Sequence, residues 1–207
     1  MSKSSIRRSQ ADRSASTISR VLDAASDVLA EKGYQGTTTT LVAERAGVSR
    51  GAILHHFPTR SALLLAAAER LLEEEVTAFR RAVDAIPEGV DRHHAAIDFL
   101  WQGARGNRHR AWTELSFGAR SDSDVADAAA GFSRHMHERI TQVWTDAFPE
   151  SQDVLVAGLA PDFATALLDG VAHRMLIGAV SPQRATELVE ALKALSNLFF
   201  NPEGDTQ

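Results

Sequence analysis

The stretch that most constrains the fold is residues 37 to 60, TTTTLVAERAGVSRGAILHHFPTR. It predicts two short helices joined by a tight turn, because a small Ala43 lets two helices cross closely and Gly47 accommodates a positive-φ turn. Val48 and Ile53 would fill the angle between the helices, while basic and hydroxyl side chains gather on one side. The pattern indicates a helix-turn-helix, so we expect the chain to bind DNA.

Polar residues mark where these two helices begin. Thr38 is expected to cap the first helix and Ser49 the second, each through a side-chain oxygen that accepts an otherwise unpaired backbone N–H. The second helix, residues 50 to 56, would present Arg50 to the major groove, where a guanidinium makes a bidentate contact with a guanine. The expected DNA-binding residues are Thr38, Thr39, Thr40, Ser49, Arg50, Gly51, Leu54, His55, His56 and Arg60.

This region resembles the TetR family of bacterial one-component repressors. The match begins at ISRVLDAASDVLAEKG, residues 18 to 33, which is similar to the family's first helix, and continues through the helix-turn-helix to Arg60 and Leu63. It covers about 50 of 207 residues. Leu54 and His55 stand where many members carry an aromatic pair. The resemblance implies an N-terminal DNA-reading head on a helical body that pairs through its last two helices.

Composition and charge fit a protein with one DNA-facing end. Residues 1 to 60 hold nine Lys/Arg and five Asp/Glu, a net charge of +4, although the whole chain has a formal net charge of −5. A basic segment on an acidic body suits contact with phosphate through one face. The absence of cysteine excludes disulfides and thiolate metal sites, and no apolar run is long enough for a membrane span. We therefore expect a cytoplasmic protein.

Apolar residues recur at helical spacing along the rest of the chain, and no alternating strand pattern competes. We predict an all-α fold of about nine helices, with further helices at 60–85, 90–104, 108–118, 123–147, 155–179 and 183–200. The predicted domains are a disordered basic arm at 1–14, a three-helix DNA-binding domain at 15–59, a larger helical ligand-binding and dimerisation domain at 60–201, and a disordered tail at 202–207.

The body carries more large apolar side chains than a spacer requires, including Trp144, Phe163 and Met175. One interpretation is an internal pocket for a small molecule, and the alternative is an ordinary helical core. Polar residues that would orient such a ligand include His109 and Asp169. The predicted ligand-binding residues are Trp101, Trp112, Phe117, Phe132, Met136, Leu167 and Val171.

A single short recognition helix reads only a few base pairs, so selective binding needs two half-sites read by a symmetric pair. We therefore predict a homodimer. Its interface would use apolar stripes on the last two helices, although either stripe alternatively packs inside its own subunit. The predicted interface residues are Leu168, Met175, Leu188, Leu192, Leu195 and Phe199.

The predicted function is a ligand-responsive transcriptional regulator, most simply a repressor that binds a palindromic operator and is released by a small apolar or amphipathic effector. We predict no catalytic residues, metal or cofactor, because no phosphate-binding glycine loop, nucleophile elbow or metal-binding histidine spacing occurs. Two alternatives stay open: a constitutive architectural DNA-binding factor without an inducer, and a helical small-molecule carrier or enzyme. The residues do not identify the effector, the operator or the regulated genes.

Overall fold

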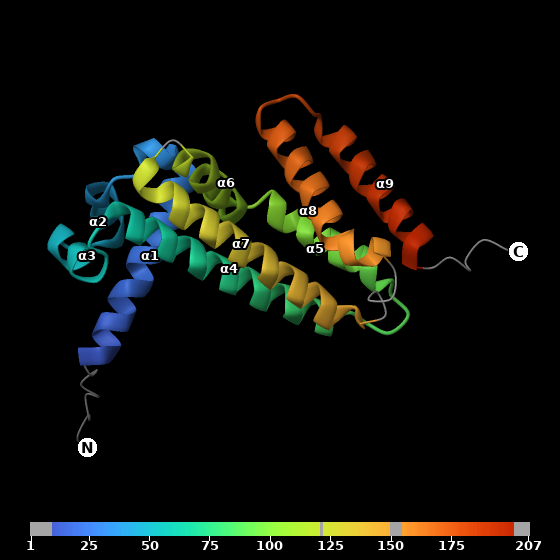
Figure 1. The fold of residues 1–207 in the computed structure, drawn as a ribbon, viewed down its shortest axis with the longest axis horizontal. Helices are drawn as coiled ribbons and strands as arrows, with labels where there is room; N and C mark the ends of the chain where they lie inside the picture. Colours follow the sequence, from blue (N-terminus) through green and yellow to red (C-terminus); the bar gives the residue numbers. More distant parts are fainter. Residues whose placement is uncertain (1–9, 121, 150–154, 201–207) are drawn as a thin grey trace, which may run out of the picture. The chain divides into compact units, whose positions relative to one another are not determined.

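A computed structural model describes residues 10–120, 122–149 and 155–200, and every regular element within these ranges is helical. The fold is therefore all-α, as predicted (Figure 1). The helices are α1 (Gln10–Gly36), α2 (Thr39–Ala46), α3 (Arg50–His56), α4 (Arg60–Asp84), α5 (Arg92–Ala104), α6 (Asn107–Ala119), α7 (Ser123–Ala147), α8 (Leu155–Leu176) and α9 (Pro182–Phe200).

The chain divides into two compact units. Unit 1 contains residues 1–71 and 111–132, and unit 2 contains residues 72–110 and 133–207. Helices α4, α6 and α7 each contribute residues to both units. This division is not the sequential one that the sequence predicted, with a boundary between residues 59 and 60.

Two helix caps and one glycine turn shape the helix-turn-helix in unit 1. Thr38 Oγ1 accepts the Leu41 backbone N–H at 3.2 Å, and Ser49 Oγ accepts that of Ala52 at 3.1 Å, so both predicted caps are confirmed. Gly47 has φ 63° and ψ 41°, the left-handed turn that was expected of it. Its neighbour Val48 donates its backbone N–H to the Ala43 carbonyl at 3.0 Å, which satisfies a carbonyl at the end of α2.

The core of unit 1 forms where α1, the helix-turn-helix and the start of α4 meet. Val28, Val42, Ile53 and Leu63 have no solvent exposure, and Val48 and Phe57 pack partly buried against them. The same core includes Val21, Leu22, Ala24, Ala25, Ala43, Ala46 and Ala67.

Two helix boundaries differ from the prediction in an informative way. Helix α1 begins at Gln10, so residues 10–14, which were expected to belong to the disordered arm, are helical; residues 1–9 and the predicted tail at 202–207 lie outside the described residues. Gly33 has φ 70° and kinks α1 three residues before the helix ends at Gly36. Helix α8 ends at Leu176 rather than residue 179, and Gly178 takes a positive φ in the following turn.

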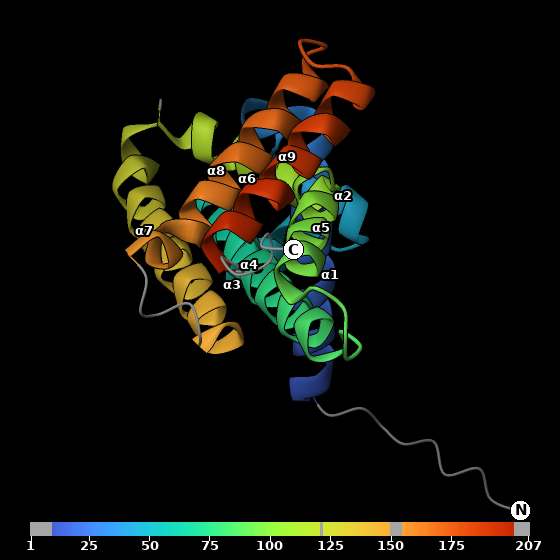
Figure 2. The ribbon, with the colours of Figure 1, turned by 90° about the vertical axis from the view of Figure 1, so that its right-hand side faces the viewer.

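In unit 2, α8 and α9 form a hairpin that packs on α5, and Figure 2 shows the three helices side by side. Ile97, Trp101, Leu168 and Val189 are buried where these helices meet. Across the described part of the chain, no helix is both long and apolar enough to cross a lipid bilayer.

Candidate nucleic-acid interface and effector region

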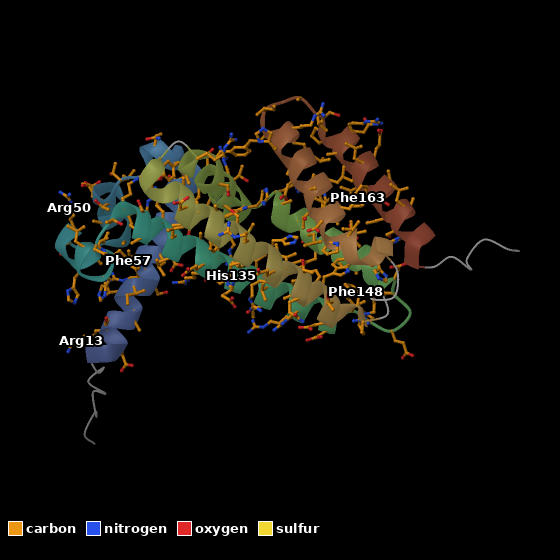
Figure 3. The ribbon with its side chains drawn as sticks, in the orientation of Figure 1. Arg13, Arg50, Phe57, His135, Phe148 and Phe163 are labelled. Carbon is orange, nitrogen blue, oxygen red and sulfur yellow. The ribbon has the colours of Figure 1, made fainter. Side chains whose placement is uncertain are left out.

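Helix α3 has one buried side and one exposed side. Ile53 is fully buried, whereas Arg50, His55 and Leu54 are exposed, Leu54 at 40%, which is high for a large apolar side chain. Arg50 makes no ion pair with another described residue, and Figure 3 shows it on the outer side of α3. Of the other predicted contacts, Thr38, Thr40, Ser49 and Gly51 are exposed, and Thr39 and His56 are partly exposed.

Arg60 holds the start of α4 onto the turn between α1 and α2. Its Nε donates to the Thr37 carbonyl at 2.6 Å, its Nη2 donates to the Tyr34 carbonyl, and its guanidinium lies 4.2 Å from the centre of the Tyr34 ring. The sequence predicted that Arg60 contacts DNA. Two of its nitrogens instead bind backbone carbonyls inside the protein, so Arg60 connects the start of α4 to residues 34 and 37.

A second arginine fixes the helix-turn-helix on α1. Arg20 Nη1 donates to the carbonyl of Ala46, the last residue of α2, at 3.3 Å. On the surface, Arg45 forms a two-pronged ion pair with Glu31, with distances of 2.9 and 2.7 Å, and this lowers the pKa of the Glu31 carboxyl. Helix α3 is therefore presented by a head whose parts are bonded to one another.

The C-terminal end of α6 packs on the kink of α1, also within unit 1. Tyr34 is 3% exposed, and its hydroxyl donates to Asp122 Oδ2 at 2.9 Å. Burial and this hydrogen bond raise the pKa of Tyr34. The backbone of Gly118 lies directly against the Tyr34 side chain, where there is no space for a Cβ atom. Tyr34 is therefore a packing residue between α1 and α6.

The seven predicted ligand-binding residues are divided between the two units. Trp112 and Phe132 pack together in unit 1, with ring centres 5.0 Å apart, whereas Trp101 and Val171 belong to the core of unit 2. Phe117 is 60% exposed. Leu167 packs partly buried against the core of unit 2, and Met136 on α7 is partly exposed.

The cavity that the structure describes in unit 2 is lined by a different set of side chains. It lies among α5, α7, α8 and α9, and it was missed because helical periodicity alone does not show which apolar positions leave a space. Trp144 was noted only as one of the large apolar residues of the body. The lining residues are His93, Ile97, Trp144, Ala160, Phe163, Ala164, Leu192, Leu195 and Ser196.

Two residues predicted at a subunit interface are instead buried within their own subunit. Leu168 is 1% exposed and Leu192 is 4% exposed, because both face the core formed with α5. Leu195 is 41% exposed, whereas Met175 and Leu188 pack partly buried against that core. The side chain of Phe199 lies outside the described side chains. For these two residues the alternative reading of the sequence therefore holds: the apolar stripes of α8 and α9 pack at these positions inside their own subunit.

Polar groups also meet inside unit 2. His109 Nε2 lies 3.6 Å from Asp169 Oδ1, which brings together two of the residues that were expected to orient a ligand. Burial raises the pKa of Glu75 on α4, although the positive charge of Arg108 opposes this shift. Among the described residues, no group of three or more histidines and carboxylates is placed to hold a metal ion.

An exposed, capped recognition helix on a buttressed three-helix head, followed by a helical body, defines the class of helix-turn-helix DNA-binding regulators. Residues 21–67 match the sequence model of the bacterial regulatory proteins of the tetR family. An uncharacterized HTH-type transcriptional regulator of Mycobacterium tuberculosis is 28% identical over 185 residues, which cover 87% of this chain and 91% of that protein.

Two further proteins are similar to this chain. The HTH-type transcriptional regulator CymR of Pseudomonas putida is 52% identical over 68 residues, 33% of this chain and 34% of that protein. The transcriptional regulator FadR of Bacillus subtilis, solved in complex with stearoyl-CoA, shares the fold with a TM-score of 0.62 at 16% identity, covering 84% of this chain and 96% of that one. Residues 21–67 therefore match the DNA-binding domain of the TetR family, and most of the chain is similar to HTH-type transcriptional regulators.

Proposed function

We propose that this regulator is a ligand-responsive repressor. It binds a palindromic operator as a homodimer and leaves the DNA when a small apolar or amphipathic effector binds its helical body. The observation that carries the proposal is the exposed side of α3, where Arg50, Leu54 and His55 project from a helix whose buried side is anchored by Ile53. The proposal includes no catalytic activity.

The side chains of α3 suit the major groove. Arg50 is exposed and makes no ion pair with a described residue, so its guanidinium is available for O6 and N7 of a guanine. Leu54 would contact a thymine methyl group, and His55 a base or a phosphate. The exposed hydroxyls of Thr38 and Thr40 at the start of α2 would contact phosphate oxygens, which position the head without reading sequence.

Pairing of two copies is supported by the exposed side of α8. Leu159 and Phe163 are 58% and 54% exposed, which is unusual for side chains of this size. Ile177 is 64% exposed; it directly follows α8, and its backbone N–H still bonds to the His173 carbonyl at 3.2 Å. Together with Ala166 and Gly170 they recur at intervals of three, four and seven residues and therefore share one face. A Cβ atom at Gly170 would meet open space, so a second helix has room to approach the backbone there.

This pairing is testable by sedimentation of the full chain. Ala166→Glu places a charge in the middle of the exposed face of α8, and we expect it to shift the protein from dimer to monomer. The matched control is Ala128→Glu at an exposed position on α7, which should sediment like the unmodified protein. Equal sedimentation of both variants as dimers would place the interface elsewhere.

The effector response is proposed as a population shift. The body would exist in two conformations, and an effector that binds one of them more tightly would disfavour the spacing of the two heads that fits the operator. Helix α4 is a single continuous helix with residues in both units, so a change in the body can reach the head through it. The complex of FadR with stearoyl-CoA supports a small-molecule effector for this fold.

The decisive experiment is a binding titration against the DNA upstream of the protein's own gene at several salt concentrations. A dimer that neutralises several phosphates should give a log–log salt slope of roughly −5 or steeper. Arg50→Ala should lose the preference for this DNA over unrelated DNA. Arg81→Ala is the matched control, because Arg81 is also exposed but lies on α4, outside the helix-turn-helix.

The outcomes separate the candidate functions. Selective binding that a candidate effector weakens would support the repressor. Selective binding that no effector changes would favour the constitutive architectural factor. Weak binding to any DNA, unaffected by Arg50→Ala, would refute the proposed role of α3 and favour a helical carrier.

A further inference from the structure

The α1–α2 joint, residues 33–38, sets where the helix-turn-helix begins. Gly33 breaks the helical path of α1 with φ 70° and ψ 177°. Thr37 is 1% exposed, and its Oγ1 donates to the Gly33 carbonyl at 2.8 Å while its backbone N–H donates to the Tyr34 carbonyl at 3.3 Å. The next residue, Thr38, caps α2. A displacement of the joint therefore displaces the first turn of α2.

The end of α6 lies against this joint, and Figure 1 shows it beside the C-terminal end of α1. A Cβ atom at Gly33 would lie 2.8 Å from Glu114 Oε2, so the Glu114 carboxylate rests on the backbone of Gly33. One turn further along α6, the backbone of Gly118 packs on the Tyr34 side chain. Just beyond the helix, Asp122 accepts the Tyr34 hydroxyl at 2.9 Å. The joint is therefore held by α6 as well as by α1.

Helix α4 reaches the same joint through Arg60. Its Nε donates to the Thr37 carbonyl at 2.6 Å, and its guanidinium lies over the Tyr34 ring, 4.2 Å from the ring centre. The Tyr34 ring therefore contacts a cation while its hydroxyl bonds to the Asp122 carboxylate. Tyr34 is the residue at which α1, α4 and the end of α6 meet.

The hydrogen bond between Tyr34 and Asp122 reaches further along the chain than the caps of the helix-turn-helix. The caps at Thr38 and Ser49 join residues three apart, whereas Tyr34 and Asp122 are 88 residues apart. The bond therefore forms only when the end of α6 is docked on the joint. Its acceptor is a carboxylate, and hydrogen bonds to carboxylates are about twice as strong as those between neutral groups.

We propose that Tyr34 and Asp122 form a latch through which the end of α6 positions the helix-turn-helix for DNA. Tyr34 is a positioning residue in this scheme, because it is buried in the head and acts through the placement of α2 and α3. Helix α6 begins in unit 2 and ends in unit 1, so it offers a route from the body to the head that does not run along α4. The inference rests on the proposed function in one respect: an effector that shifts α6 would open the latch.

The first test measures hydrogen–deuterium exchange of the full chain by mass spectrometry, without DNA. Tyr34→Phe removes the hydroxyl but keeps the ring against Gly118. We expect the backbone amides of residues 42–57 to exchange about tenfold faster, the factor that one hydrogen bond to a charged group implies. Residues 185–192 on α9, in unit 2, should exchange as in the unmodified protein, which separates loss of the latch from a general loss of stability.

Further variants show whether the two side chains act as a pair. Asp122→Ala should give the same increase, and the double variant with Tyr34→Phe should stay near tenfold, since independent effects would multiply to about a hundredfold. Asp122→Asn keeps an oxygen that accepts the hydroxyl, so its increase should be smaller. Ser26→Ala is the matched control and should leave this exchange unchanged, because it removes a partly buried hydroxyl bond within α1, to the Leu22 carbonyl at 3.1 Å.

The second test adds the DNA upstream of the protein's own gene. Coupling between two sites is reciprocal, so DNA that fixes α2 and α3 should also steady α6. We expect DNA to slow the exchange of residues 111–120 by about fivefold or more in the unmodified protein, the lower end of typical coupling. In Tyr34→Phe this slowing should disappear while α3 stays protected by DNA.

Unchanged exchange in Tyr34→Phe without DNA, or a hundredfold increase in the double variant, would overturn the latch. Equal slowing of residues 111–120 by DNA in both proteins would overturn its role in positioning the head. The first test contains no DNA, so the latch can fail while the chain still binds its operator. Absence of selective DNA binding by the unmodified protein would instead refute the proposed repressor, and with it the role of the latch in DNA binding.

Discussion

Replacing Gly118 with alanine should force α6 away from α1. A Cβ atom at Gly118 would lie 2.6 Å from Tyr34 Cδ1 and closer still to Tyr34 Cβ and Cγ, whereas ordinary contacts begin at 3.4 Å. Rotation of the Tyr34 side chain does not relieve this overlap, because the position of Cβ is set by the backbone. The two helices must therefore separate by roughly an ångström, which is the kind of overpacking that proteins tolerate poorly.

The size of the effect follows from two opposing contributions. Overpacking destabilises by about 1–3 kcal/mol, and we expect the upper end because Tyr34 is also held by Asp122 and Arg60. Alanine gains up to about 1 kcal/mol over glycine inside a helix. The net loss is about 2 kcal/mol, which lowers the thermal midpoint of a chain of this size by about 4–8 °C.

Thermal unfolding followed by circular dichroism at 222 nm measures this change. The matched control is Gly51→Ala on α3, where the nearest atom, Ser49 Oγ, lies at an ordinary 3.8 Å. That variant should keep or slightly raise the midpoint, since it gains helix propensity without a clash. A midpoint for Gly118→Ala equal to or above that of the unmodified protein would refute the close contact between α6 and α1.

Three further predictions concern stability. Gly47→Ala should lower the thermal midpoint by about 2–8 °C, since a left-handed residue with a side chain costs about 1–2 kcal/mol. Gly47→Asn should lower the midpoint less. A midpoint for Gly47→Ala equal to that of the unmodified protein would contradict the left-handed turn. Thr59→Ala should lower the free energy of unfolding by about 1 kcal/mol, because Thr59 Oγ1 accepts the Ala62 backbone N–H at 3.0 Å. Thr59→Ser keeps the hydroxyl, so its free energy of unfolding in urea should stay close to that of the unmodified protein. Burial raises the pKa of Glu75 in the folded state, so its neutral form favours folding and stability is lost as pH rises through that pKa. Glu75→Gln should therefore unfold at a higher temperature than the unmodified protein at pH 7.5, with the difference shrinking toward pH 4.5; a difference independent of pH would rule out this ionisation.

The helix-turn-helix was predictable almost residue by residue because its signals are local. A cap such as Thr38 bonds a backbone group three residues away, and Gly47 adopts a conformation that its own lack of a side chain permits. Such interactions depend on neighbours in the chain and not on distant partners. The bounds of most helices followed from the same kind of signal, together with the period of the apolar residues.

The role of Arg60 was not predictable in this way. In the sequence it is a basic residue next to a recognition helix, which is typical of a phosphate contact. Its partners are the carbonyls of Thr37 and Tyr34, more than 20 residues earlier in the chain. A carbonyl becomes a binding partner only after α1, α2 and α4 have packed, so the assignment needed the tertiary structure.

The amino-acid sequence by itself determined that this chain is helical and that its N-terminal segment is a helix-turn-helix with an exposed recognition face. Only the tertiary structure decided which side of each long helix faces inward. On α8 the sequence offers apolar residues all around, and the packing of α5 and α9 buries Leu168 while leaving Phe163 exposed. The cavity beside Trp144 arises in the same way, since an empty space depends on how four helices fit together and on no single stretch of sequence.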